Sequence, residues 1–201
     1  MNFLNSSLYQ TLNTLSNFFL LSLLWLLMCL PIITIFPATA GLFAVVREWH
    51  TKKNTRLFSI FFRYFKENFK QSILLSLMWA LCIVILYIDF LYTKQLPPTM
   101  KNIFLTILYT AGGLVAFTSI FIFPVMVQYK SNVIRLIKAS FFLSIAFLPL
   151  TLICLLVLGL IIGAAYIFPI SIFLTISLGA FIIYAICNNA FQKVYSKKDF
   201  S

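Results

Sequence analysis

The sequence predicts an all-α membrane protein: a polytopic bundle of about five transmembrane helices plus a cytoplasmic, interfacial amphipathic helix. Composition is the first of three observations that predict it. The 201 residues are 62% hydrophobic and only 9% charged, whereas soluble domains are about 45–50% apolar and about 25% charged. A water-soluble fold has no interior large enough for this excess, so we expect residues 1–201 to form a single integral membrane domain.

The lengths of the apolar runs are the second observation. A helix needs about 20 apolar residues to cross a bilayer. The runs in this chain predict five spans, at approximately 16–36, 71–92, 102–127, 140–162 and 168–190. Residues 1–15 carry leucines at three- and four-residue spacing, which predicts either an amphipathic helix in the interface or a frayed tail.

The placement of charge is the third observation. Seven of the fifteen Lys and Arg residues fall in 42–70, which we interpret as a basic cytoplasmic loop. With that loop inside, the inner segments carry thirteen Lys and Arg residues and the outer segments only Lys94 and Lys101. This positive-inside bias predicts an N-terminus outside the cell and a C-terminus in the cytoplasm.

The net charge of +11 indicates an anionic partner. Because the cations stand at the ends of apolar runs, a bilayer with anionic headgroups is favoured, and nucleic acid is not expected. The predicted headgroup contacts are the seven cations of the loop, namely Arg47, Lys52, Lys53, Arg56, Arg63, Lys66 and Lys70.

Prolines interrupt two of the predicted spans. Pro31 and Pro37 lie near the end of the first span, and Pro124 is expected to break the third near its inner end. The carbonyls that prolines free inside a membrane need partners, and the hydroxyls of Thr34 and Thr39 can serve. Pro31, Thr34, Pro37 and Pro124 are therefore candidate hinge residues; a plain kink at the membrane exit is the alternative.

The second half of the basic loop has the periodicity of a helix. Phenylalanines at 58, 61, 62, 65 and 69 share one face, opposite Arg63, Lys66, Glu67 and Lys70. This pattern predicts an interfacial helix on the cytoplasmic leaflet. A docking surface for a soluble partner is the alternative interpretation.

Two other patterns lie within the spans. Asp89 is expected near the outer interface, beside Lys94, rather than at mid-membrane, where an acid would be a functional candidate. Gly159 and Gly163 form a G-x-x-x-G pair, which favours close helix packing; simple relief of crowding in an aromatic-rich helix is the alternative. The chain contains a Phe-Pro pair followed by a Lys-x-Ser motif twice, first at Pro37 and Lys70 and again at Pro124 and Lys138. This repeated order predicts two parallel structural repeats.

The residues that carry chemistry are few. Four cysteines stand apart at 29, 82, 154 and 187, and His50 is the only histidine. The chain has no H-E-x-x-H, no G-x-S-x-G and no acid pair. We therefore expect no enzyme activity, no catalytic residue, no cofactor and no metal site.

Several segments together resemble the YesL-like family of bacterial integral membrane proteins. They are Leu24-Trp25, the run 30–34, the run 37–40, Leu42-Phe43, Phe61, the run 65–72 and Phe123-Pro124. The family tends to have Asn at the position of Ser22 and Gly at that of Phe36. Its members are uncharacterised and are often encoded near carbohydrate-uptake genes of Gram-positive bacteria.

The resemblance implies an accessory or regulatory role in carbohydrate uptake or utilisation, in a bacterial cell membrane and beside a carbohydrate transporter complex. It supplies no catalytic residues. A small membrane transporter or channel subunit, for a sugar or another small solute, is the alternative function. The sequence does not predict an oligomeric state.

Overall fold

The computed structural model describes residues 3–51, 56–129 and 131–198, and this part of the chain is helical, with no strand. Five helical segments within it are long and apolar enough to cross a membrane, at Ile32–Thr51, Phe69–Thr93, Met100–Gln128, Leu148–Ile167 and Pro169–Lys193. The predicted fold class is therefore confirmed.

The α-helices are α1 (Phe3–Met28), α2 (Ile35–Thr51), α3 (Leu57–Glu67), α4 (Phe69–Thr93), α5 (Pro98–Gln128), α6 (Val133–Ala146), α7 (Leu148–Ile167) and α8 (Ile172–Lys198), with 3-10 turns at Ile32–Thr34 and Pro169–Ser171.

Helix α2 is the centre of the molecule. It packs against α1, α3, α4, α5 and α8, and nearly every side chain from Pro37 to Val46 is buried. Small residues such as Ala38, Ala40 and Gly41 allow this, because they let neighbouring backbones approach closely.

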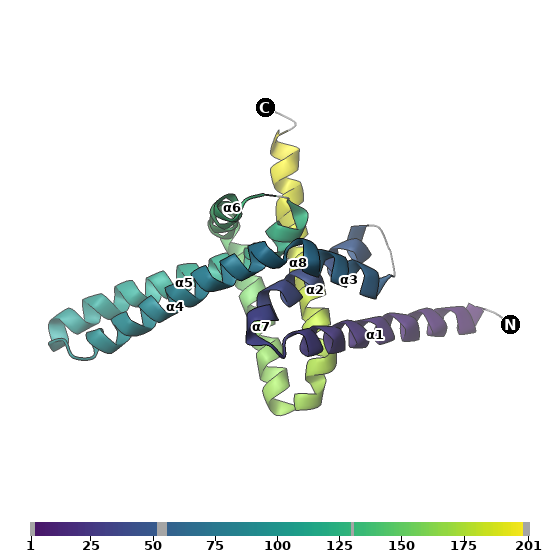
Figure 1. Ribbon diagram of the computed structural model, residues 1–201, viewed down its shortest axis with the longest axis horizontal. Coiled ribbons are helices and arrows are strands. Elements are labelled where there is room, and N and C mark those ends of the chain that lie inside the picture. Colours follow the sequence, from purple (N-terminus) through teal and green to yellow (C-terminus); the bar gives the residue numbers. More distant parts are fainter. Residues whose placement is uncertain (1–2, 52–55, 130, 199–201) are drawn as a thin grey trace.

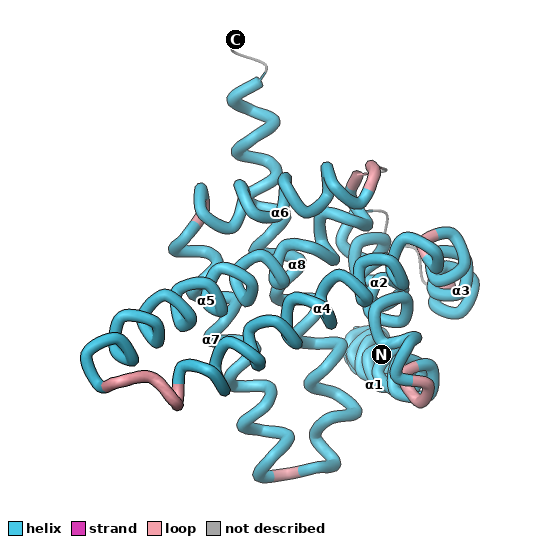
Figure 2. The backbone as a smooth tube through the Cα atoms, turned by 60° about the vertical axis from the view of Figure 1, so that its left-hand side comes forward, coloured by secondary structure: helices cyan, strands magenta, loops and turns pink. Residues whose placement is uncertain are grey.

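The remaining long helices form two hairpins that diverge from α2. Helices α4 and α5 run side by side to a tip at 94–97, and α7 and α8 run to a second tip at 168–171 (Figures 1 and 2). The α7–α8 tip lies opposite the C-terminal end of α8, whereas the α4–α5 hairpin extends sideways from the centre of the molecule. The two hairpins therefore diverge from each other.

The first apolar stretch is divided between two helices. The span predicted at 16–36 is not one helix, since α1 ends at Met28 and α2 begins at Ile35. Pro31 begins the intervening 3-10 turn, and the Thr34 hydroxyl can donate to the carbonyl oxygens of Met28 and Pro31, each at 2.6 Å. The hydroxyl thus provides a hydrogen-bond donor for carbonyl oxygens that the helix break leaves without an intrahelical partner. Backbone groups in lipid need such partners. Residues 3–15 are helical, part of α1.

The basic loop predicted at 42–70 is mostly helical. Helix α2 continues through 42–51, α3 occupies Leu57–Glu67, and α4 starts at Phe69. The phenylalanine rings of α3 and the start of α4 lie together as predicted, since Phe61 contacts Phe62 and Phe65, and Phe65 contacts Phe69. Leu57, Ile60 and Phe61 are buried, while Phe58 and Phe62 are exposed.

The second and third predicted spans agree closely with α4 and α5. The Trp79 indole nitrogen joins them by donating to the Ser119 hydroxyl at 2.7 Å. Pro124 was expected to break α5, but the helix continues past it to Gln128. Pro37 also causes no break, because it lies in the first turn of α2, where backbone N–H groups have no intrahelical acceptor.

The fourth predicted span, at 140–162, is interrupted in the structure. Helix α6 ends at Ala146, and α7 begins at Leu148 with Pro149 in its first turn. Proline is favoured at a helix start because it has no N–H to leave unpaired. The Thr151 hydroxyl reaches back to the carbonyl oxygens of Ser144 and Phe147 at 2.9 and 3.1 Å, much as Thr34 does at the first break.

The glycines pack differently from the prediction. A Cβ added at Gly159 or Gly163 would meet nothing within 4 Å, so this pair makes no close contact within the described chain. Gly179 instead lies against Ile161 where α7 and α8 pack together, and Gly41 lies under the ring of Phe61. Close contacts between helices at glycine therefore occur at the single residues Gly41 and Gly179, and not at the predicted G-x-x-x-G pair.

The predicted internal repeat is not present in the helix order. Pro37 lies in the first turn of α2, whereas Pro124 lies near the end of α5. Lys70 follows the break at Asn68, whereas Lys138 lies within α6, before the break at Phe147. The similar residues occupy different structural positions, so the echo does not mark equivalent units.

Candidate functional site

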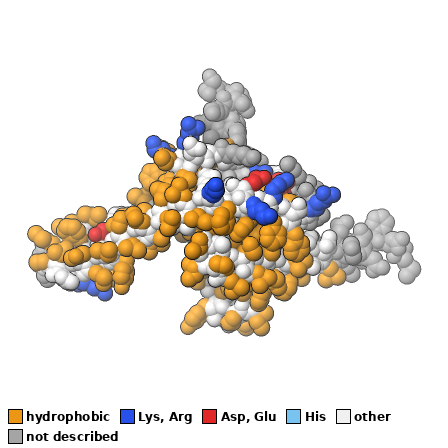
Figure 3. Space-filling view, in the orientation of Figure 1, with side chains coloured by type: hydrophobic (Ala, Val, Ile, Leu, Met, Phe, Trp, Pro, Cys, Tyr) orange, Lys and Arg blue, Asp and Glu red, His pale blue; other side chains and the backbone are white. Residues whose placement is uncertain are grey.

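Lys and Arg side chains gather at one end of the molecule. Figure 3 shows them over α3, α6 and the beginning of α4, while the α7–α8 hairpin presents an apolar surface. We call this region, formed by α3, α6 and the adjoining ends of α2, α4, α5 and α8, the basic end. It contains the candidate functional site, because polar and charged side chains meet there among apolar helices.

A buried ion pair lies at the centre of the basic end. The Arg47 Nη2 atom lies 3.2 Å from Glu48 Oε1, and the two side chains are only 19% and 3% exposed. Nη2 also donates to the Tyr64 hydroxyl at 2.8 Å, and Nη1 donates to the carbonyl oxygen of Val127. One guanidinium therefore links α2 to both α3 and α5.

A second polar contact extends this network to α8. The buried Tyr184 hydroxyl donates to Gln128 Oε1 at 3.1 Å, and the ring of His50 packs edge-on against Tyr184, with 5.8 Å between centroids. We call Arg47, Glu48, Tyr64, Gln128 and Tyr184 the Arg47 cluster. It joins four helices, α2, α3, α5 and α8, at one level of the fold.

Helix α3 is attached on one face and open on the other. Phe61 is fully buried against Gly41, and Tyr64 contacts Arg47. Phe58 and Phe62 are 54% and 38% exposed, and the cations at 63, 66 and 70 are exposed beside them. Such a face, which combines aromatic and cationic side chains, suits a membrane surface or a protein partner.

A polar cavity lies beside α3. Its volume is about 470 Å³, and its lining residues are Glu67, Asn68, Gln71, Tyr129, Ser131 and Asn132. Every one of these side chains can form hydrogen bonds. A more apolar cavity of about 410 Å³ adjoins it through the shared Gln71, Ser131 and Asn132, and adds Leu74, Val133 and Ile134.

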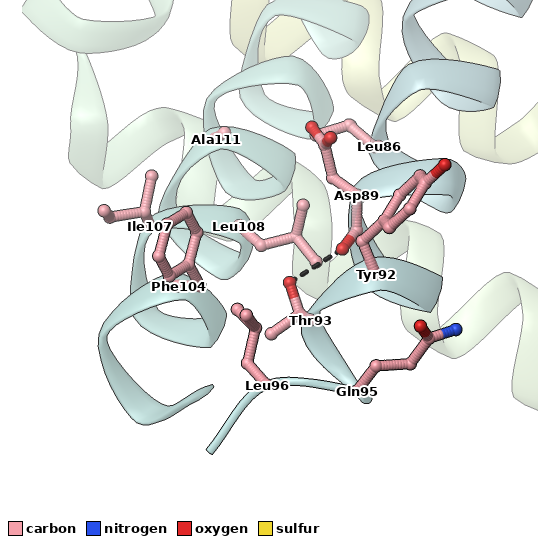
Figure 4. A pocket seen from close by; sticks show the side chains of 10 residues that line it. All are labelled: Leu86, Asp89, Tyr92, Thr93, Gln95, Leu96, Phe104, Ile107, Leu108 and Ala111. Atoms are coloured by element: carbon pink, nitrogen blue, oxygen red, sulfur yellow. Dashed lines mark hydrogen bonds between the residues drawn. The ribbon is translucent and has the colours of Figure 1, made fainter. Parts of the chain in front are cut away.

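A different cavity lies near the α4–α5 tip. It has a volume of about 660 Å³, and Figure 4 shows apolar side chains such as Phe104 and Leu108 facing Leu96 across it. Asp89 lines it as well. The ammonium group of Lys94 lies 4.6 Å from the centre of the Phe90 ring.

The structure separates the predicted headgroup contacts into three groups. Arg56, Arg63, Lys66 and Lys70 are exposed. Arg47 was misassigned, because its guanidinium is mostly buried in the Arg47 cluster rather than directed at headgroups. Lys52 and Lys53 lie outside the described residues.

The sequence also left some site residues undetected. Tyr64, Gln128 and Tyr184 carry no motif, and they meet only because distant helices pack together. The one available signal was the charged pair Arg47–Glu48 at the end of an apolar run, since ionisable residues in such runs are functional candidates. Within the described residues, no three His, Cys, Asp or Glu side chains gather as a metal site would require.

Comparison with known proteins identifies the family. The family model described as "Protein of unknown function, DUF624" matches residues 18–90. The chain is 33% identical to the uncharacterized protein YesL of Bacillus subtilis (strain 168) over 130 residues, which are 62% of this chain and 60% of YesL. It is also 33% identical to the uncharacterized protein YteU of the same organism over 176 residues, which are 82% of this chain and 78% of YteU. No solved structure matches the chain. This chain, with its five helices long and apolar enough to cross a membrane, belongs to the YesL-like family of proteins of unknown function, DUF624.

Proposed function

We propose that the protein is a non-enzymatic, multi-pass protein of the bacterial cell membrane that assists or regulates carbohydrate uptake or utilisation. Its partner would be a carbohydrate transporter complex, and the exposed face of α3 would be the docking surface. The resemblance to YesL-like proteins motivates the link to carbohydrate. The observation that carries the docking role is the attachment of α3, one face of which packs on α2 while the other is exposed.

The attachment of α3 favours docking over a loosely held membrane-surface helix. Phe61 and Tyr64 fix the helix to α2 through a glycine contact and a hydrogen bond to Arg47. A pre-organised surface loses less conformational entropy on binding than a mobile one. The exposed Phe58, Phe62 and Arg63 then supply aromatic and cationic groups, which are enriched in protein interfaces.

We further propose that the basic end faces the cytoplasm and that both hairpin tips face outward. The distribution of thirteen Lys and Arg residues against two supports this orientation. So does the direction of the α7–α8 hairpin, whose tip lies opposite the C-terminal end of α8. The N-terminus would lie outside if α1 stays in the outer interface.

Co-purification in mild detergent tests the docking role. We expect the wild-type chain to capture membrane subunits of a carbohydrate transporter, identified by mass spectrometry. The variant Phe58→Ser/Arg63→Glu should capture at least about tenfold less, because losing an exposed aromatic anchor and reversing a charge each weaken an interface by about 1 kcal/mol or more.

A matched variant on α6 serves as the control. Phe142→Ser/Lys138→Glu makes the same kinds of change at exposed positions of the other short helix, and it should capture transporter subunits as the wild type does. Equal capture by the α3 variant and the wild type would refute the docking role. Sugar transport by the purified chain alone in liposomes would refute the accessory role.

The second candidate function is a small transporter or channel subunit for a sugar or another small solute. One observation favours it: the cavity of about 660 Å³ between α4 and α5, which is bordered by the Asp89 carboxylate. An acid within a membrane-embedded helix is a common element of solute pathways.

A further inference from the structure

The polar cavity beside α3 has an unusual chemical character for this chain. The protein is 62% hydrophobic, yet all six residues that line the cavity offer hydrogen-bonding side chains: Glu67, Asn68, Gln71, Tyr129, Ser131 and Asn132. They come from the α3–α4 corner and from the turn between α5 and α6. Its volume of about 470 Å³ lies within the range of small-molecule sites.

Two of the amide side chains have a fixed orientation. Gln71 Nε2 donates to the carbonyl oxygen of Ser131 at 2.8 Å, and Asn68 Nδ2 donates to that of Tyr64 at 3.1 Å. Each amide nitrogen is therefore engaged with backbone, and each side-chain oxygen is left as an acceptor for a ligand. With the Glu67 carboxylate, these two oxygens give the cavity three acceptors, while the Tyr129, Ser131 and Asn132 side chains can both donate and accept.

A ligand for this cavity needs several hydrogen-bond donors. Hydroxyl groups meet this need, and neighbouring hydroxyls can both donate to one carboxylate. An organic cation also has donors, but exposed Lys66, Lys70 and Arg135 on the same elements raise the local potential and disfavour it. Glu67 disfavours an anion inside the cavity. A neutral molecule with many hydroxyls fits best.

We propose that this cavity binds a neutral, polyhydroxylated ring of the sugar class. The proposal deepens the accessory role and rests on it for its biological meaning. A sugar bound next to α3 would signal the availability of sugar to the partner docked on that helix. The ring has two possible sources, a soluble sugar or the headgroup of a glycolipid. The adjoining apolar cavity, lined by Leu74, Val133 and Ile134, would hold the first part of an acyl chain in the second case.

Ligand-detected NMR on the full chain in nanodiscs tests the proposal. One arm uses glucose, sucrose and myo-inositol as soluble probes, and the other uses nanodiscs that contain monoglucosyl-diacylglycerol. We expect saturable binding in at least one arm. It should weaken by about tenfold in Asn132→Ala and in Gln71→Leu, because each loses about one hydrogen bond to the ligand.

Matched controls separate binding from folding. Asn132 forms no capping bond at the start of α6, so Asn132→Ala should leave the melting temperature unchanged, whereas Gln71→Leu also loses the bond to Ser131. Asn102→Ala makes the same change as Asn132→Ala near the α4–α5 tip and should bind as the wild type does. A lack of saturable binding in both arms, equal binding by Asn132→Ala, or a preference for ethanolamine over every sugar would overturn the proposal.

The two proposals can fail separately. If transporter capture depends on Phe58 and Arg63 but no sugar binds, only the ligand assignment is wrong. If sugar binds through Asn132 but no transporter subunit is captured, the accessory role is wrong and the cavity remains a sugar site.

Discussion

Replacing Arg47 with methionine is expected to destabilise the protein by about 3 kcal/mol. The change leaves the Glu48 carboxylate buried without its guanidinium partner, and breaking one side of a buried pair costs about 3–5 kcal/mol. It also removes donors to Tyr64 and to the carbonyl oxygen of Val127. Denaturant titration in detergent micelles, followed by far-ultraviolet circular dichroism, measures the loss.

The double variant Arg47→Met/Glu48→Leu separates the ion pair from packing. With both charges gone, no buried carboxylate has lost its guanidinium partner, so more than half of the lost stability should return. Arg47→Lys keeps the charge but cannot form the same forked contacts, and it should fall between the wild type and Arg47→Met. If Arg47→Met is as stable as the wild type, the Arg47 cluster does not hold the four helices together.

Gly41→Leu is expected to displace α3 and to cost about 2 kcal/mol. Even a Cβ at this position would lie 3.1 Å from the ring of Phe61, and overfilling a packed contact costs about 1–3 kcal/mol. Because Phe61 and Tyr64 hold α3 to α2, the detached helix should become a good protease substrate. Limited trypsin digestion at Arg63, with the melting temperature, reports both effects.

Gly159→Leu is the matched control for that experiment. A Cβ at Gly159 meets nothing within 4 Å, so the same substitution should leave both the melting temperature and the trypsin pattern unchanged. If the two leucine variants behave alike, the contact between Gly41 and Phe61 does not position α3.

Composition and periodicity were enough to predict the helical membrane fold. An apolar run of membrane-spanning length has few alternatives to a helix, because the backbone must satisfy its own hydrogen bonds in lipid. The spans at 71–92 and 102–127 therefore match α4 and α5 closely. The amphipathic helix α3 was also predicted from its periodicity, although Phe58 and Phe62 face outward.

The errors arose where a local signal had two meanings. Residues 42–51 were interpreted as the beginning of the basic loop, but they are helical as part of α2, and Arg47 pairs with Glu48 there. Pro124 was expected to end a helix that passes through it, while Pro149, which begins α7, was overlooked. In each case the outcome depends on tertiary partners that the local sequence does not identify.

The candidate site was harder to predict than the fold. The polar cavity combines the α3–α4 corner with a turn about 60 residues later in the chain, and its central bond joins Gln71 to the backbone of Ser131. No spacing rule connects such residues, because helix packing alone brings them together. The same holds for Tyr64 and Tyr184 in the Arg47 cluster.

Cysteine labelling on intact cells tests the central claim most directly, namely that the chain crosses the membrane several times with its basic end inside. Single cysteines at Lys66 on α3 and at Gln95 and Phe168 on the two tips would be introduced after replacing Cys29, Cys82, Cys154 and Cys187 with alanine. An impermeant maleimide should label Gln95→Cys and Phe168→Cys on intact cells, and Lys66→Cys only after permeabilisation. Labelling of all three positions from the same side would contradict the claim.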